Sequence, residues 1–426
     1  MSAGPSAATG STAAALRHVL GHFVTPLLMC IGMGLAYLGA FHAPEPHDLR
    51  VDVVGSGPSA QVLAQTLQDK SDGALSVRTV PDRAEAVNHL RTQASYGAYL
   101  PGEHPELLVA GASSDTSATV VERVFTKVAA GQGEPLKVTD TAPTADGDPT
   151  GQGIFFLLVA VSIGSYASVA VIGGAGAVLA LRIRGALAVA ASLVVSVIGV
   201  VFAGPLFGLV DHGLGGLWAM AWLYSAGILL IGVGLHTFLK RWTTLGLMVL
   251  FVMLNFTSSG GIFRPELQPG FFASLHSFWN GAGFVEGVRS HVYFDGHALG
   301  GHVLVLALWF VAGLALMGLA GLAESKRRKA AVVTAMTGTA TATATATGTG
   351  TGTGTSSGAV AGSAEAGGTH GPRHAARNGA GTRTGAGSGE GAGAGSAEGA
   401  GAGSAERAEE EMEEEMEEEM EEAVGV

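Results

Sequence analysis

The chain has 426 residues, of which 14% are charged and 47% are hydrophobic, and its mean hydropathy is +0.38. These values exclude an ordinary soluble protein of this length. The formal net charge of −12 comes almost entirely from residues 406–422, which hold 12 Glu and one Arg. The rest of the chain is close to neutral, so we expect no nucleic-acid partner. The single cysteine, Cys30, excludes an intramolecular disulfide.

Six stretches are apolar and long enough to be membrane-spanning helices, because about 20 residues rising about 1.5 Å each cross the hydrocarbon core. The first has too long an apolar run for a cleaved signal peptide, so we expect it to remain as an anchor. The fifth is the weakest, because its last residues, 255–261, are polar or small, and an early end with a turn there stays open. The six stretches are residues 19–41, 153–181, 187–210, 214–239, 243–262 and 303–322.

Basic residues next to these stretches set the orientation, because short loops rich in Lys and Arg stay in the cytoplasm. We therefore expect both termini in the cytoplasm and residues 42–150 outside the cell, in a multi-pass protein of the plasma membrane. The basic residues on the cytoplasmic side are Arg17, Arg182, Arg184, Lys240, Arg241, Lys326, Arg327, Arg328 and Lys329.

Residues 42–150 show strand patterns alternating with helical patterns, which is typical of a small α/β domain. Asp82 is the expected N-cap of one helix, because it follows Pro81 and can accept a backbone hydrogen bond. Residues 142–150 form a linker rich in Pro, Asp and Gly. The predicted strands are residues 49–54, 75–80, 96–100, 107–110 and 136–138, and the predicted helices are 59–68, 82–91 and 117–129.

A glycine-rich turn in this region, Gly55-Ser-Gly57-Pro-Ser-Ala60, follows a strand and precedes a helix. A dinucleotide-binding turn needs an acidic residue about 20 positions further on, at the end of the second strand. That strand ends Val77-Arg78-Thr79-Val80 and has no acid. We therefore interpret the motif as a strand-to-helix turn and expect no cofactor.

The membrane region predicts closely packed helices and no ion-driven pump. Residues 153–181 carry small residues, which let helices approach each other in lipid. None of the six stretches contains Asp, Glu, Lys or Arg, the groups that ion-driven transporters bury. Very short turns are expected at residues 182–185 and 211–213. Trp218, Trp222, Tyr224 and Trp242 are expected at the membrane interfaces.

Residues 258–301 are too long and too apolar for a plain linker. Gly260, Gly261, Pro265 and Pro269 break helices, and two short amphipathic segments follow at 270–278 and 284–292. In the second segment, Glu286 and Arg289 are three apart and should pair on one helical face. Two interpretations stay open: an interfacial packing layer, and a lid or re-entrant outer gate.

Four histidines in and after this segment, His276, His291, His297 and His302, do not have zinc-site spacing, so we expect no metal. No set of residues indicates catalysis, and we do not expect an enzyme. Residues 1–18 and 323–426 are of low complexity and are expected to form a disordered cytoplasmic leader and tail.

Three segments carry a family resemblance: residues 49–54, residues 82–101 with Tyr96-Gly-Ala-Tyr-Leu100-Pro101, and residues 258–289 ending in Gly287-Val288-Arg289. With one span, an external domain and five further spans, the chain from 17 to 322 resembles the membrane subunit of type-2 ABC transporters, and more closely the phage-infection-protein branch. It departs from that pattern at Trp279-Asn280-Gly281, where the family often has Leu-Pro-Gly.

The resemblance implies a permease that works as a homo- or heterodimer in the lipid bilayer and exports a lipidic or amphipathic compound. A separate cytoplasmic ATPase would drive it and would contact Arg182 and Arg184. The chain has no Gly-Lys-Ser/Thr, so it lacks the phosphate-binding loop of such an ATPase. The alternative is a cell-envelope receptor or assembly scaffold, in which the external domain binds a partner and the spans only anchor it.

Overall fold

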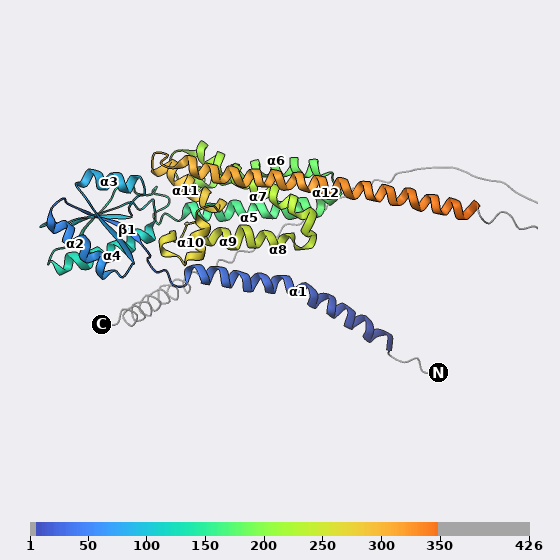
Figure 1. Cartoon of the computed structure of the whole chain (residues 1–426), viewed down its shortest axis with the longest axis horizontal. Helices are drawn as coiled ribbons and strands as arrows, with labels where there is room; N and C mark the ends of the chain where they lie inside the picture. The colour runs from blue at the N-terminus through green and yellow to red at the C-terminus, as the bar shows by residue number, and fades with distance from the viewer. Residues whose placement is uncertain (1–5, 348–426) are drawn as a thin grey trace, which may run out of the picture. The chain divides into compact units, whose positions relative to one another are not determined.

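The computed structural model of the chain describes residues 6–347, which are mostly helical with one small sheet (Figure 1). Two shorter helices, α8 (Thr243–Met248) and α9 (Leu254–Thr257), are joined by a π-helical segment, Val249–Met253. The other helices are α1 (Ser6–Phe41), α2 (Pro58–Lys70), α3 (Arg83–Arg91), α4 (Asp115–Gly131), α5 (Gly153–Gly174), α6 (Leu181–Val201), α7 (Leu214–Leu239), α10 (Gly270–His276), α11 (Asn280–Tyr293) and α12 (Leu299–Thr347).

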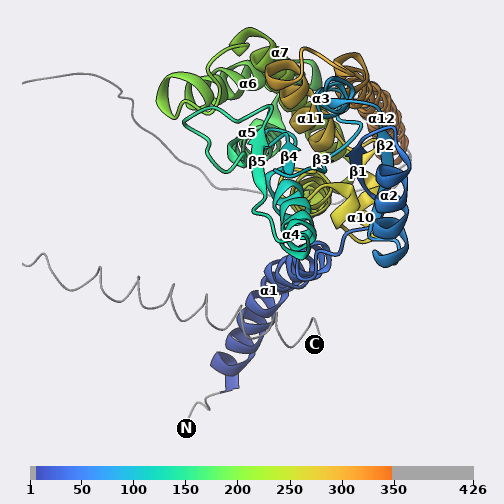
Figure 2. The same ribbon diagram turned by 90° about the vertical axis from the view of Figure 1, so that its left-hand side faces the viewer.

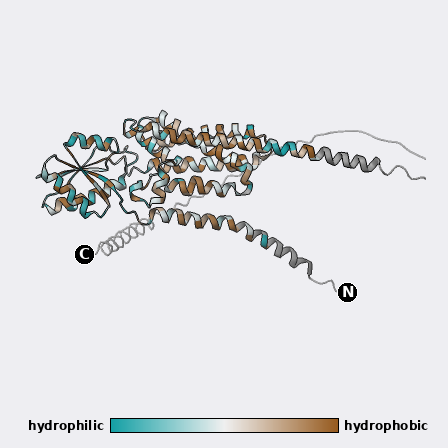
Figure 3. Ribbon diagram, in the orientation of Figure 1, coloured by the Kyte–Doolittle hydropathy of each residue, from teal (hydrophilic) through white to brown (hydrophobic). Residues whose placement is uncertain are grey.

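Five helical stretches within residues 6–347 are long and apolar enough to cross a membrane, which is compatible with a multi-pass membrane protein (Figure 3). Two of them extend beyond a regular helix, into a 3-10 turn at Ala175–Val178 and a π-helical turn at Phe202–Leu206. The five stretches are Phe23–Phe41, Gly153–Val178, Leu181–Leu206, Leu214–Leu239 and Leu299–Thr334.

The fifth stretch expected from the sequence, 243–262, is shorter than predicted and ends as a helix at Thr257. At about 1.5 Å per residue the run Thr243–Thr257 extends roughly 22 Å, against about 30 Å for a hydrocarbon core. The side chains of Thr257 and Ser258 donate back to the carbonyls of Met253 and Leu254, at 2.7 Å and 2.6 Å. Gly260 then takes φ +73°, which a helix cannot continue through.

Helix α6 starts earlier than the predicted 187–210, and the predicted turn at Arg182–Gly185 is wrong. These residues form the first turn of α6, and the break before it lies at residues 179–180. Arg184 can enter the bundle, where it is only 5% exposed, because it forms an ion pair with Glu324 of α12. Arg182, by contrast, is exposed.

The directions of the long helices follow from their contacts. Helices α5, α7 and α12 run parallel to one another, and α6 runs antiparallel to α5. Because α7 and α12 start at the same end, the chain from 240 to 298 must return to that end, and Thr243–Thr257 lies on this path. The contacts are Ser162–Tyr224 and Gly173–His236 for α5 and α7, Gly227–Phe310 and Gly234–Leu316 for α7 and α12, and Gly164–Val195 and Gly199–Val161 for α5 and α6.

Five strands form one sheet in the order β2-β1-β3-β4-β5, parallel except for the antiparallel pair β3 and β4. The predicted strands 49–54 and 75–80 are confirmed at both ends, and the other three within a few residues. Asp82 caps α3 as predicted, because its carboxylate accepts the Glu85 N–H at 2.9 Å. The strands are β1 (Leu49–Val54), β2 (Leu75–Val80), β3 (Gly97–Leu100), β4 (Glu106–Val109) and β5 (Lys137–Asp140).

The two faces of the sheet have separate cores, as the alternation of strand side chains requires. On one face, Val51 and Tyr99 pack with Phe125 of α4, and the Tyr99 and Phe125 rings stack at 4.8 Å. The other face is covered by α3 (Figure 2), and there Ala98 packs with Leu90 of α3 and with other small and aliphatic residues. Phe294, which follows α11, belongs to this second core, so the sheet is packed directly against the helical part.

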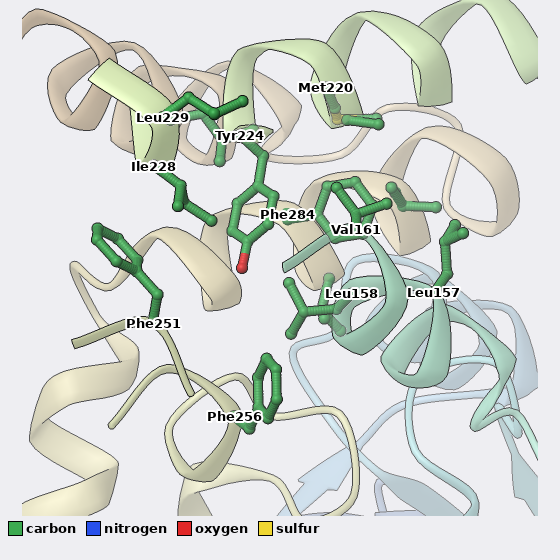
Figure 4. Packing of buried hydrophobic residues seen from close by; sticks show 14 of the residues in the cluster. Leu157, Leu158, Val161, Met220, Tyr224, Ile228, Leu229, Phe251, Phe256 and Phe284 are labelled. Carbon is green, nitrogen blue, oxygen red and sulfur yellow. The ribbon is translucent and has the colours of Figure 1, made fainter. Parts of the chain in front are cut away.

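Helix α7 lies at the centre of the helical part and packs against α5, α6, α11 and α12. Its residue Tyr224 is 1% exposed and its ring lies 5.3 Å from that of Phe284, among apolar side chains of α5 and of the 249–256 segment (Figure 4). The prediction that Tyr224 lies at a membrane interface is therefore wrong. Its hydroxyl has buried partners, which allows a tyrosine to lie inside the bundle.

The helices at the two ends extend into regions predicted to be disordered. Helix α1 begins at Ser6, inside the predicted leader 1–18, and α12 continues from 323 to Thr347. Both extensions are rich in Ala, the strongest helix former. The remainder of the predicted leader and tail, 1–5 and 348–426, lies outside the described residues.

Candidate functional site

Helix α11 is the most deeply buried part of the 258–301 segment. All but two of its 14 residues are buried, so the predicted amphipathic helix at 284–292 is wrong. Three glycines permit this burial. A Cβ at Gly281 would lie 2.3 Å from the Asn255 side chain, one at Gly283 3.1 Å from Val305, and one at Gly287 2.9 Å from Met220.

Helix α11 runs antiparallel to α12, so the first residues of α11 lie farthest from the start of α12. Its C-terminal end lies close to the start of α12, and Gly283 contacts His302 and Val305. The Trp309 indole donates to the carbonyl of Phe278 at 2.8 Å. Trp309 lies about 15 Å along α12 from Leu299, at about 1.5 Å per residue. The pair α10 and α11 therefore forms a hairpin that turns beside Trp309.

Three charged side chains at the open end of this hairpin form a buried cluster. The Glu286 carboxylate forms ion pairs with Arg264 and with Arg289, the latter at 3.0 Å. Arg289 also donates to the carbonyls of Gly260 and Gly261, at 2.8 Å and 3.1 Å. The expected Glu286–Arg289 pair is thus confirmed, and the carbonyls of Gly260 and Gly261, which follow the end of α9, have a donor.

The cluster continues into the sheet through Tyr96, which precedes β3. Arg264 donates to the Tyr96 hydroxyl at 3.2 Å, and that hydroxyl donates to Glu266 at 2.8 Å. Glu266 also pairs with Arg50 of β1 at 3.0 Å. A continuous set of ion pairs and hydrogen bonds thus joins α11 to β1 and to the residue before β3.

Electrostatics fix the charge states in this cluster. Burial alone would raise the pKa of Glu286, but the guanidiniums of Arg264 and Arg289 outweigh it and lower this pKa to about 2. Burial lowers the pKa of His276, although Glu286 opposes the effect. Glu286 is therefore charged and His276 neutral at pH 7. The His276 ring is 3.0 Å from the Ser258 carbonyl, to which it donates.

A second, uncharged network lies at the turn of the hairpin. The Asn255 amide donates to the Tyr224 hydroxyl at 2.6 Å, and its oxygen accepts the Gly281 N–H at 2.7 Å. The Tyr224 hydroxyl is also 2.6 Å from the Ser162 hydroxyl. The small residues of α5, predicted only to permit close packing, therefore also supply hydrogen bonds.

The structure brings together some of the sequence-predicted gate residues and separates others. Gly260, Gly261, Glu286 and Arg289 meet in the charged cluster. Pro265 starts the 3-10 turn Pro265–Leu267 and Pro269 directly precedes α10, so both shape the path without joining the cluster. The predicted ATPase contacts lie elsewhere, at the start of α6.

Sequence reasoning missed four members of the cluster: Arg50, Tyr96, Arg264 and Glu266. One signal was present, because Arg264 and Glu266 flank Pro265 in an otherwise apolar segment. Charged residues there need buried partners if the segment is packed. The partners Arg50 and Tyr96 are too distant in the chain for any local pattern to indicate.

The histidines of this region do not converge. His291 is 3.2 Å from the Gly213 carbonyl, whereas His276 faces Ser258. Within residues 6–347, no group of three His, Cys, Asp or Glu side chains is placed to hold a metal ion.

The glycine-rich turn at residues 55–60 has its glycine for backbone and packing reasons. Gly55 has φ +143°, and a Cβ there would lie 2.8 Å from Ala60.

Comparisons with family models, with curated proteins and with solved structures found no match. The resemblance to type-2 ABC transporter membrane subunits accordingly stays a prediction from the residues.

Proposed function

We propose that the chain is the permease subunit of an ABC-type exporter for a lipidic or amphipathic compound. A separate cytoplasmic ATPase energises it, and the working unit is a dimer in the cell membrane. Both termini are cytoplasmic, and the sheet lies outside the cell as an α/β domain inserted between the first and second spans. The α10–α11 hairpin is the outer gate.

The sixth crossing in this proposal is Thr243–Thr257. It is shorter than a full span, and the parallel directions of α7 and α12 support a crossing between them. The π-helical segment and the preceding 3-10 turn at Lys240–Trp242 lie on the same path. Local thinning of the bilayer accommodates a short crossing at modest cost.

The observation that carries the proposal is the buried hairpin with its charged cluster. Short helices that enter a membrane protein from one side must lie against protein or line a cavity, because lipid cannot satisfy their free ends. Buried ionisable groups at such places commonly mark a transport path or a gate. Here the cluster links the hairpin to the sheet, so a movement of the sheet is transmitted to α11.

The test is affinity purification of the full chain from its native membrane in mild detergent, followed by mass spectrometry. We expect a nucleotide-binding subunit to co-purify, and Arg182→Ala to weaken that association. Arg83→Ala, at the exposed start of α3 on the proposed outer side, is the matched control and should leave it unchanged. Arg184 is unsuitable for this test, because its substitution also removes the ion pair with Glu324.

Recovery of envelope proteins or of this chain alone, with no nucleotide-binding subunit, would contradict the permease and favour the receptor or scaffold.

A further inference from the structure

Asn280, the first residue of α11, has a buried side-chain amide with no hydrogen-bond partner among the described residues. It is 0% exposed, and neither its nitrogen nor its oxygen has a hydrogen bond to any described residue. An amide can donate twice and accept twice. Native proteins rarely leave such a group unpaired in the interior, so this residue calls for a functional explanation.

A second asparagine beside it shows the ordinary arrangement. Asn255 is also 0% exposed, but its nitrogen donates to Tyr224 and its oxygen accepts the Gly281 N–H. The two amides are thus neighbours in the same interior, one fully engaged in packing the helices and the other not. The Asn255 amide therefore has a structural role, whereas the Asn280 amide is available to a ligand.

The position of Asn280 favours a ligand that accepts hydrogen bonds. Side chains on an α-helix tilt toward its N-terminus, so this amide projects past the first turn of α11. The N-terminal end of a helix carries a partial positive charge, which favours anionic oxygens. The Trp279 side chain does not cap the helix, and of the N–H groups in this first turn that of Gly281 is taken by Asn255.

Aromatic side chains lie between the N-terminal end of α11 and the surface of the bundle. The Trp279 ring lies 5.2 Å from Trp309 and 5.6 Å from Phe278. Phe278 is 51% exposed, whereas Trp279 is 7% exposed. An apolar path of rings therefore leads from the outside of the bundle to the buried amide, which suits a molecule with one polar and one apolar end.

We propose that the N-terminal end of α11 binds the anionic oxygen group of an amphipathic substrate, with Asn280 as a specificity-determining ligand. This proposal rests on the proposed export function and names the chemical class of the substrate. The apolar part of that substrate lies along Phe278, Trp279 and Trp309. Binding requires the hairpin to open, since the amide is fully covered in this conformation.

The test is thermal unfolding of the purified full chain in detergent with three soluble probes. These are dioctanoyl phosphatidylglycerol, dioctanoylglycerol, which lacks the phosphate, and inorganic phosphate. We expect phosphatidylglycerol to raise the unfolding midpoint by about 5 °C at roughly a hundredfold excess over its Kd. The other two probes should shift the midpoint by less than a quarter as much.

Two substitutions at Asn280 and one at Asn255 separate binding from folding. Asn280→Leu removes an unpaired polar group, so the ligand-free midpoint should rise by roughly 2–4 °C while the response to phosphatidylglycerol is lost. Asn280→Asp should also lose the response, because a carboxylate repels the anionic probe. Asn255→Leu is the matched control and should lower the ligand-free midpoint, because it leaves the Gly281 N–H unpaired.

A response to phosphatidylglycerol that persists in Asn280→Leu would overturn the proposal, as would equal shifts from dioctanoylglycerol or from inorganic phosphate, or no shift with any probe. The measurement uses the isolated chain, so it does not depend on the ATPase. A missing ATPase with a positive phosphatidylglycerol response would therefore reject the exporter and keep the binding site.

Discussion

The Tyr96 hydroxyl donates a hydrogen bond of 2.8 Å to the Glu266 carboxylate and thereby joins the sheet to the segment that precedes the α10–α11 hairpin. The same hydroxyl accepts from Arg264. One phenol oxygen thus connects the sheet with both charges that flank Pro265, and its position determines whether the sheet and the hairpin move together.

Substituting Tyr96 by Phe tests this connection. Tyr96→Phe leaves the ring in place but removes the hydroxyl that bonds both Arg264 and Glu266, so we expect a loss of about 1–3 kcal/mol in the free energy of unfolding. Tyr99→Phe is the matched control. Its hydroxyl only donates to Gln132, at 3.2 Å, and its loss should cost about 1 kcal/mol or less.

Chemical denaturation monitored by tryptophan fluorescence gives both values. A smaller loss for Tyr96→Phe than for Tyr99→Phe would contradict the connecting role.

Glu286 is the centre of the charged cluster, since it is 3% exposed and forms ion pairs with two guanidiniums. Glu286→Gln leaves Arg264 and Arg289 buried with no opposing charge on α11, which we expect to destabilise the fold by about 3–5 kcal/mol. Asp295→Asn is the control, because Asp295 pairs with Arg91 at an exposed position and should change stability by less than about 1 kcal/mol.

Equal effects of the Glu286 and Asp295 substitutions on the thermal midpoint in detergent would show that the buried cluster contributes no more to stability than an exposed ion pair.

The cluster also predicts a pH dependence. Burial lowers the pKa of His276 below its ordinary 6.5, in a setting that includes Glu286, Arg264 and Glu266. The unfolded chain therefore takes up the proton first, so the free energy of unfolding should fall as the pH drops below 6.5 toward the folded pKa. Glu286, with its pKa at about 2, adds a further loss only between about pH 4.5 and 2.

Replacing the histidine isolates its share of this acid sensitivity. His276→Gln can still donate to Ser258 but cannot titrate, so its unfolding midpoint should vary less between pH 7 and 5 than that of the native chain. His104→Gln, at an exposed position, should keep the native profile. Identical profiles for all three proteins would assign the acid sensitivity to other groups.

The proposed orientation predicts which positions a membrane-impermeant maleimide can reach in whole cells. In a Cys30→Ala background, a cysteine at Val62 of α2 should be labelled directly, because the site is 64% exposed on the proposed outer side. A cysteine at Val332, which is 58% exposed near the cytoplasmic end of α12, should be labelled only after permeabilisation. The reverse pattern would invert the orientation.

Local patterns were enough to predict the strands, although not their order in the sheet. Alternating side chains located Leu49–Val54 and Leu75–Val80, and the Pro81-Asp82 pair located the start of α3, because strand pleat and helix caps depend on neighbouring residues. The apolar stretches were also predicted from the sequence, but several of their ends were not. Arg184 was placed in a turn because its partner, Glu324, lies on another helix.

The buried hairpin was harder to foresee for a related reason. The period of apolar residues at 284–292 suggested an amphipathic helix, although Gly281, Gly283 and Gly287 allow close contact on the remaining sides. Only the Glu286–Arg289 pair is local, three residues apart, and it alone was predicted. The rest of the cluster depends on how β1, the residue before β3 and the 258–267 segment come together in space.

The spacing of the charged cluster along the chain has a consequence for biosynthesis. Arg50 and Tyr96 leave the ribosome long before Arg264, Glu286 and Arg289. Domains generally fold as units in the order of their synthesis, so the sheet is complete when the last polar segment emerges. That segment therefore meets strands that are already in place, and the hairpin is assembled late, once Phe294 and α12 have been made.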